Sequence, residues 1–305
     1  MFSLTNKILF FAQQKNMKTS ILSLVIACWL QISSAQTSSV LWEIKGNGLS
    51  SPSYLFGTLK FIGANEFKIP TAVADKIKES KTFAIEDQVD HHAQHELNVA
   101  LHFPKGKSLA TELSAEDYKK VVDFFQKEFG ISKAAFESKY AHIKPLALSI
   151  LMTRLTLREK VKYYDMELLL FAKKNKLNAF SLENIEREAQ AINAYPMFNQ
   201  VRALLHSIDN FATQKAEFQK MMASYPQETL EEIFDYTLHP VENNPIFVEE
   251  FYFKRNVEWL PKIEKMMKEN VSFICVGVSH LEGQQGLLEL LKGKGYVLTP
   301  ILVAK

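Results

Sequence analysis

Short runs of β-prone residues occur near both ends of the chain. Val40 to Ile44 is a short β-prone run, and Tyr54 to Thr58 follows after a stretch rich in glycine, serine and proline, so the two runs predict a hairpin. The apolar, β-branched run at 271–276 is typical of a strand covered on both faces. The complete set of predicted strands is 40–44, 54–58, 81–86, 178–183, 271–276 and 296–303.

Between these strands, apolar positions recur every three to four residues, which predicts helices. Ser114 stands three residues before Asp117, a capping pattern for a helix that reaches Phe129. Pro245 suits the first turn of another helix. The other predicted helices are about 70–80, 146–157, 166–174, 197–222, 227–237, 246–268 and 283–292.

Strands at both ends of the chain around a helical middle predict an α/β fold. We expect a central mixed sheet built from the N- and C-terminal strands, with a large helical middle region. No proline-rich or serine-rich linker interrupts the chain, so we expect a single domain.

The first 35 residues have the layout of a cleavable secretory signal peptide. Lysines but no acidic residues precede the apolar run 21–30, which is shorter than the about 20 residues that span a bilayer. Small residues follow, with Ala35 at the expected cleavage point. We therefore expect residues 1–35 to be removed and residues 36–305 to be exported to the periplasm or the extracellular space.

Two alternatives concern the same segment. The signal is complete from Met17, so Met17 could be the initiator. Cys28 follows Val25 to Ala27 in a lipoprotein-like context and could be acylated as a membrane anchor. Both alternatives still predict an exported protein.

Charge and cysteine content exclude several classes of protein. The 305 residues carry 36 basic and 34 acidic side chains, and removal of the three leader lysines leaves 33 basic residues. This near neutrality argues against nucleic-acid binding. Two cysteines cannot build a disulfide scaffold, and Cys275, in a buried strand, is expected to be inert. We expect no transmembrane helix in the mature chain, and no feature indicates an oligomeric state.

A glycine followed three residues later by a basic residue occurs directly after two of the predicted strands. Gly57 precedes Lys60 in this way, and Gly277 precedes His280. Glu86 ends the third strand. Ligands bind at the carboxyl ends of strands in open α/β sheets, so His280 and Glu86 could be metal ligands or an acid/base pair. A turn glycine beside an incidental histidine is the alternative.

Three blocks of sequence resemble the TraB/PrgY/GumN family, which is related to the Tiki-type metalloproteases. They run from Leu41 to Thr58, from Asp165 to Glu183, and from Arg255 through His280 to Tyr296. The resemblance implies two Gly-x-x-His motifs and an acidic residue, which together hold a divalent metal (Mn, Co or Zn) for hydrolysis of a peptide or protein substrate. Gly277 and His280 match the second motif, and Glu86 matches the acid.

Lys60 departs from that family pattern, because it stands where the first motif has histidine. A protonated lysine has no lone pair for a metal, and removing its proton at pH 7 costs about 4–5 kcal/mol. We expect metal binding to be weakened or absent and Lys60 to pair with Glu86. Three interpretations follow: an altered metal-dependent hydrolase, a non-catalytic periplasmic binding or sensing protein, and a metal-free hydrolase with Lys60 as its base.

Other polar residues have two interpretations each. Arg255 could stabilise charge in a hydrolase site or form a salt bridge on a half-buried helix. Glu183 could approach the site or cap the next helix. We expect Asp165 to cap or to pair with another residue. His91, His92 and His95 could bind zinc, but their polar neighbours favour a solvated helix face.

One further motif argues against a function. The segment from Gly277 to Leu281 superficially suggests the nucleophile elbow of a serine hydrolase. Leu281 stands where that motif requires glycine, so we do not expect this chemistry.

Overall fold

The structure is a computed structural model, and it describes residues 39–86, 100–158, 160–226, 230, 233 and 244–303. Three predictions fall outside these residues wholly or in large part: the signal peptide 1–35 with Cys28, the cluster of His91, His92 and His95, and the helix 227–237.

The described residues form a six-stranded mixed sheet in the order β6-β4-β7-β2-β1-β8. The pairs β6–β4, β4–β7 and β7–β2 are parallel, whereas β1 pairs antiparallel with both β2 and β8. The fold class predicted from the sequence is therefore confirmed. The strands are β1 (Leu41–Gly46), β2 (Ser53–Thr58), β4 (Thr82–Ile85), β6 (Asn178–Ser181), β7 (Ser272–Gly277) and β8 (Tyr296–Ile301).

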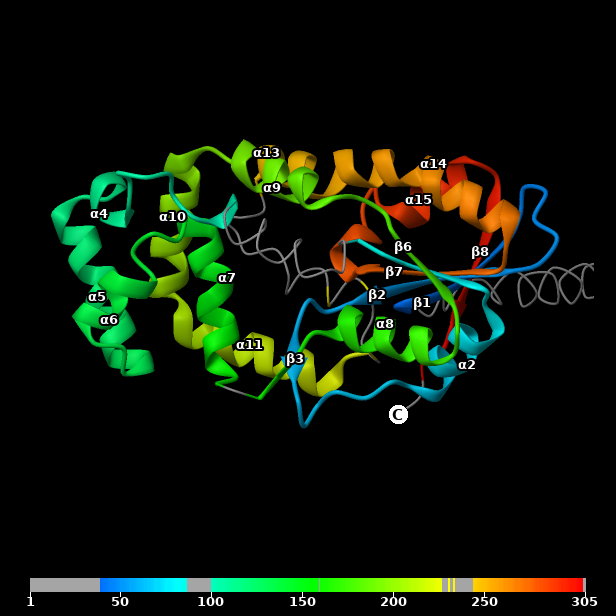
Figure 1. Ribbon diagram of the computed structural model, residues 1–305, viewed down its shortest axis with the longest axis horizontal. Helices are drawn as coiled ribbons and strands as arrows, with labels where there is room; N and C mark the ends of the chain where they lie inside the picture. The colour runs from blue at the N-terminus through cyan, green and yellow to red at the C-terminus, as the bar shows by residue number, and fades with distance from the viewer. Residues whose placement is uncertain are drawn as a thin grey trace, which may run out of the picture. The chain divides into compact units, whose positions relative to one another are not determined.

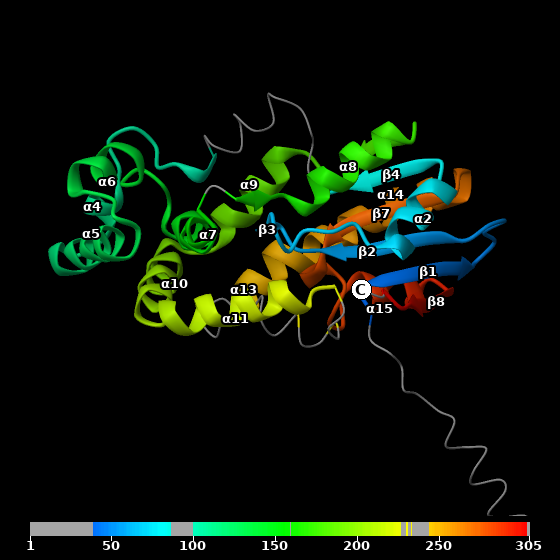
Figure 2. The same cartoon turned by 90° about the horizontal axis from the view of Figure 1, so that it is seen from below.

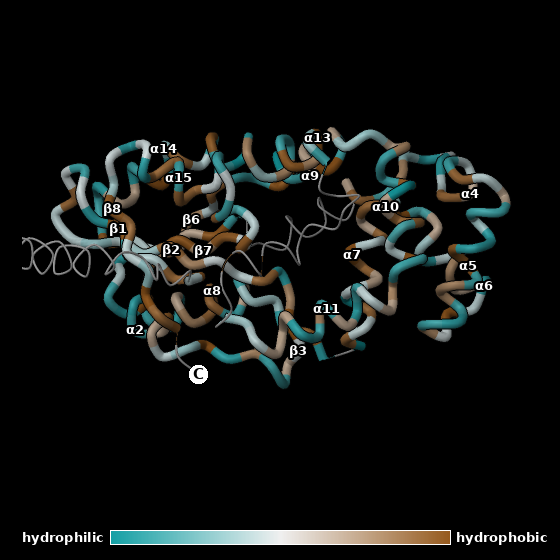
Figure 3. Tube along the Cα trace, turned by 180° about the vertical axis from the view of Figure 1, so that it is seen from behind, coloured by the Kyte–Doolittle hydropathy of each residue, from teal (hydrophilic) through white to brown (hydrophobic). Residues whose placement is uncertain are grey.

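Helices cover both faces of this sheet. Figure 1 shows α14 (Lys254–Glu269) and α15 (Leu287–Gly293) on one face, and α2 (Thr71–Glu79) and α8 (Tyr164–Lys174) on the other. The central strands β2 and β7 are almost entirely buried, and the apolar, β-branched sequence of β7 predicted this for that strand. Figure 3 shows hydrophobic residues along both strands.

The helical middle region has a hydrophobic core of its own beside the sheet (Figure 2). Phe125 and Phe136 are at its centre, with ring centroids 4.9 Å apart. The Ser114 side chain caps α5 as predicted, by accepting a hydrogen bond from the Asp117 N–H. The helices of this region and those that link it to the sheet are α4 (Leu109–Glu112), α5 (Ala115–Phe129), α6 (Lys133–Lys139), α7 (Pro145–Thr156), α9 (Ile185–Ala194), α10 (Met197–Asp209), α11 (Phe211–Ser224) and α13 (Pro245–Val248).

Three helix predictions differ from the structure. The helix predicted over 197–222 is two helices, because the Asn210 amide bonds the His206 carbonyl at 3.0 Å and ends α10. The helix predicted over 246–268 contains a π-helical segment, Glu249–Phe253. The helix predicted from 283 begins at Leu287, because Gly283 adopts a φ of +90°.

A small two-stranded sheet, β3 (Ile62–Gly63) with β5 (Val161–Lys162), lies outside the sequence predictions. In the part of the chain that the structure describes, none of the helices has both the length and the apolar character needed to cross a bilayer.

Candidate functional site

The carboxyl ends of β4, β7 and β2 bring the two glycine motifs and Glu86 to one edge of the sheet. Thr58 pairs with Gly277 across β2 and β7, and Ile85 pairs with Cys275 across β4 and β7. Glu86 follows Ile85, and its Oε1 accepts a hydrogen bond from the Gly277 N–H. The sequence therefore predicted correctly that these strand ends meet.

Neighbouring atoms lie close to both motif glycines. A Cβ atom on Gly277 would lie 3.1 Å from Glu86 Oε1, in the space that the carboxylate fills. A Cβ atom on Gly57 would lie 2.6 Å from Leu281 Cδ1 and 3.0 Å from Val278 Cα. Both glycines thus allow the tight approach that places Glu86 and the 278–281 turn.

His280 is 2% exposed, and its tautomer is set by Asn256. The Asn256 amide N donates to the backbone carbonyls of His280 (3.2 Å) and Gln285 (2.9 Å). Its Oδ1 is therefore the acceptor that faces His280 Nδ1, at 2.7 Å. The imidazole proton lies on Nδ1 and the Nε2 lone pair faces the site. Burial, Arg255 and Lys60 hold the pKa of His280 well below its usual range, which keeps the ring neutral.

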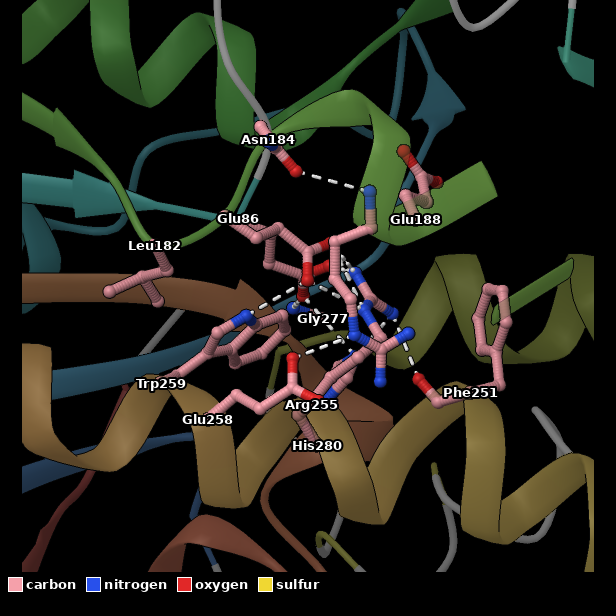
Figure 4. A network of polar contacts seen from close by, with 12 residues as sticks. Glu86, Leu182, Asn184, Glu188, Phe251, Arg255, Glu258, Trp259, Gly277 and His280 are labelled. Atoms are coloured by element: carbon pink, nitrogen blue, oxygen red, sulfur yellow. Dashed lines mark hydrogen bonds and ion pairs between the residues drawn. The ribbon is translucent and has the colours of Figure 1, made fainter. Parts of the chain in front are cut away.

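Arg255, on α14, is the cation at the centre of the site (Figure 4). Its Nη1 lies 3.2 Å from His280 Nε2, and its Nη2 lies 3.2 Å from Glu86 Oε2. Its Nε and Nη2 also bind Glu183, with a shortest distance of 2.6 Å. Burial opposes the charge of the guanidinium, but Glu86 and Glu183 outweigh it and raise the pKa of Arg255.

Glu183 belongs to this site and not to a helix cap. Its Oε2 accepts a hydrogen bond from Trp259 Nε1 at 3.0 Å, in addition to the bonds from Arg255. The capping interpretation is wrong, because the Asn184 side chain caps α9 by accepting from the Arg187 N–H at 3.1 Å. Burial raises the pKa of Glu183, although the bonds from Arg255 and Trp259 oppose that rise.

The pairing of Lys60 differs from the sequence expectation. Its Nζ lies 2.9 Å from Glu188 Oε1, on the first turn of α9, whereas Glu86 is bound by Arg255. The Lys60 side chain is 51% exposed and that of Glu188 is 5% exposed. Lysine is accommodated here because its charged end stays in contact with water while it neutralises a buried carboxylate.

Asp165 lies in the first turn of α8, and its Oδ1 accepts from the Met166 N–H at 3.0 Å. The expected capping role is wrong, because Tyr163 is the N-cap of α8 and the helix has no side-chain capping hydrogen bond. The carboxylate lies within electrostatic range of Lys60 and Glu86. Burial raises its pKa to about 6, Lys60 lowers it and Glu86 raises it. The Cys275 thiol is fully buried, and burial raises its pKa well above the usual range, which agrees with an inert thiol.

The donor set does not fit a tightly held divalent metal. Within the described residues, no group of three or more histidine, cysteine, aspartate or glutamate side chains could hold a metal ion. Glu86 Oε1 and His280 Nε2 are 3.7 Å apart, and the Arg255 guanidinium contacts both residues. Structural and catalytic zinc sites use three or four protein ligands, so this pair is incomplete.

A groove of about 400 Å³ adjoins the site. Glu183 and Trp259 line it, together with the end of β6, the start of α9 and one face of α14. Glu183 therefore belongs to the groove lining, and its carboxylate binds Arg255.

Sequence reasoning missed the supporting residues. Asn256 and Trp259 were not assigned roles, although Arg255 and Trp259 stand four residues apart in a predicted helix and must share a face. Glu188 belongs to no recognisable sequence motif, so its contact with Lys60 became visible only in the structure, where it lies on the first turn of α9.

The fold and the site define an α/β protein with a buried histidine–arginine–carboxylate centre at the carboxyl ends of parallel strands. The profile of the TraB/PrgY/gumN family matches residues 40–300. The chain belongs to this family, as the sequence resemblance indicated. No curated protein and no solved structure gives a significant match.

Proposed function

We propose that this chain is an exported peptide-binding protein that keeps the cleft of its family and has lost metal-dependent turnover. One observation carries the proposal: the Arg255 guanidinium contacts both Glu86 and His280, the two residues expected to bind a metal. Lys60 adds no third ligand, because an ion-paired ammonium has no lone pair.

The energetics of the centre support a retained function. A buried cluster of charged residues is weak evidence for stability, because desolvation offsets much of the attraction between its members. Arg255 and Glu183 nevertheless make several direct hydrogen bonds in an almost water-free position. Apolar side chains at this position would give a core of at least equal stability, so stability alone does not account for the charged cluster.

A metal-dependent peptidase is the second candidate, and the orientation of His280 favours it. A histidine that binds a metal usually donates its other ring N–H to a fixed acceptor, and Asn256 Oδ1 is such an acceptor for His280. The third interpretation, with Lys60 as a base, has less support because Lys60 is bound to Glu188.

Calorimetric titration with Mn²⁺, Co²⁺ and Zn²⁺ tests the proposal. We expect weak binding by the wild-type chain and at least about 10-fold tighter binding by Lys60→His, which restores a ligand. A degenerate peptide library with the same metals measures turnover. Stoichiometric tight binding by the wild type, with hydrolysis that His280→Ala abolishes, would establish the peptidase instead.

Export rests on the N-terminal sequence and has its own test. Mass spectrometry of the mature protein should find Gln36 as the first residue. An acylated Cys28 would establish the lipoprotein alternative, and an intact N-terminus in the cytoplasm would contradict export.

A further inference from the structure

Within the described part of the chain, strand β6 is an edge of the sheet. It stands first in the strand order of the described residues, and all four of its residues are exposed. We propose that β6 binds an extended peptide as an added parallel strand, with the carboxyl end of the peptide in the groove beside Glu183. This inference rests on the proposed function, because it says how the peptide is held.

The backbone of β6 has donors and acceptors that face outward. Asn178 N donates to Lys81 O at 3.1 Å, and Leu182 N donates to Ile85 O at 2.8 Å, so alternate residues bond β4. In a parallel ladder the intervening residues point the other way. The N–H and C=O groups of Ala179 and Ser181 therefore lie along the open edge, at the spacing that another strand matches.

The groove lies where the carboxyl end of a parallel strand would arrive. Ser181, the last residue of β6, lines the groove, and so does Lys262 of α14. The Lys262 Nζ donates to the neutral carbonyl of Leu182 at 2.6 Å.

The other charges of the groove are matched by neighbouring side chains. Arg187 is paired with Glu258 at 2.7 Å, and Glu183 is bound by Arg255. Among the described residues, Lys262 is therefore the groove cation without a carboxylate partner, and a terminal carboxylate complements it.

A second copy of the chain is the less favourable occupant of this edge. Strand β6 has four residues, of which two face outward. Two such strands would bury far less surface than the roughly 1,200 Å² of a small stable interface. A peptide that pairs with β6 and also enters the groove gains a second contact, between its terminal carboxylate and Lys262.

The experiment uses the full mature chain and a library of N-acetylated hexapeptides with free carboxyl ends. The tightest peptide is labelled, and its affinity is measured by fluorescence anisotropy against the same peptide as an amide. Ala179→Pro removes one outward N–H at an edge position where proline is tolerated. We expect affinity to fall at least about 10-fold, while the matched control Ala179→Val stays within about 3-fold.

Lys262→Met tests the orientation of the peptide. The wild type should prefer the free acid over the amide by about 5- to 10-fold, and Lys262→Met should reduce this preference to near one. Thermal melting checks that each variant folds. Should Ala179→Pro fail to fold, N-methylation of the peptide ligand tests the same contacts. Methyl groups on the alternate residues whose N–H groups face β6 should abolish binding, and methyl groups on the other residues should not.

Three outcomes would overturn strand addition: no peptide retained by the wild type, unchanged binding by Ala179→Pro together with equal tolerance of both N-methyl series, or a dimer in sedimentation that Ala179→Pro dissociates. The metal titration is independent of this edge. Tight metal binding with hydrolysis would overturn the binding-protein proposal and leave strand addition standing. Weak metal binding without strand addition would leave the binding-protein proposal standing and overturn strand addition.

Discussion

The ends of β2 and β7 carry the same short motif and end in opposite environments. After Gly277, the chain places His280 2% exposed, with its Nδ1 on Asn256. After Gly57, the chain places Lys60 about half exposed, with its Nζ on Glu188. The two strands are parallel neighbours, so the difference arises in the three residues after each glycine and in what covers them.

Burial decides which basic residue each strand end accommodates. The β7 end is sealed by α14, and the residue there must be neutral because Arg255 already provides the positive charge. The β2 end stays open to water, so an ammonium keeps part of its hydration. The comparison teaches that a shared spacing predicts where a side chain lies but not its protonation state.

Exchanging the two residues tests this comparison most strongly. His280→Lys would place an ammonium in a buried position against Arg255, and we expect the free energy of unfolding to fall by about 4 kcal/mol or more. Lys60→His should cost about 1 kcal/mol or less at the open end. Urea denaturation of both variants at pH 7.5 measures the difference, and equal losses would refute the role of burial.

Removing the central cation should have the next largest effect. Arg255→Met leaves the buried Glu183 carboxylate without its partner, and we expect a loss of about 3–5 kcal/mol in the free energy of unfolding. Glu258→Gln, on the same helix in an exposed pair, is the control and should cost less than about 1 kcal/mol. A similar loss in both variants would show that the centre is no more important than the surface of α14.

The Asp165 carboxyl gives the site a pH dependence with a definite sign. Its native pKa of about 6 lies above the unfolded value of 3.8, so the native state keeps a proton that the unfolded state has released. Its contribution to stability is present below pH 4 and is lost as the pH rises through 6.

Asp165→Asn should therefore be more stable than the wild type at pH 7.5, by about 2 kcal/mol after allowance for its partial exposure. The two proteins should converge near pH 4. Urea denaturation across this range provides the measurement. A constant difference at all pH values would show that Asp165 does not titrate, and a further gain in a Lys60→Met background would show that the ammonium at the open end reaches it.

Tyr225 supports the β2 end and gives the smallest predicted effect. Its hydroxyl donates to the Gly57 carbonyl at 2.6 Å in a buried position. Tyr225→Phe should lower the free energy of unfolding by about 1 kcal/mol, since the carbonyl loses one bond. Thermal denaturation measures it. A loss as large as that of Arg255→Met would mean that the contacts at the β2 end contribute as much to the free energy of unfolding as those at the β7 end.

The sequence allowed the sheet and the meeting of the strand ends to be predicted, because both depend on local patterns. Apolar runs mark β2 and β7, and chain order with parallel pairing brings Glu86 to Gly277. The predicted partner of Lys60, Glu86, was wrong. The actual partner, Glu188, lies on α9 more than a hundred residues away, and no local pattern in the sequence indicates that the two side chains meet.

The role of Glu183 was left open for a related reason. A carboxylate at a strand end can cap the next helix or turn toward the sheet, and Asn184 takes the cap. The choice between the two depends on Arg255, a residue that packing alone brings to that place.

The position of β7 has a consequence for how the chain acquires its structure. Although β7 is the seventh of the described strands in chain order, it lies between β4 and β2 in the sheet. These two early strands therefore do not pair with each other, and only residues 272–277, which pair with both, join them into one sheet. Contacts of such large sequence separation form slowly. Assembly of the sheet must wait for nearly the whole polypeptide, so a chain truncated before Ser272 would lack its central strand.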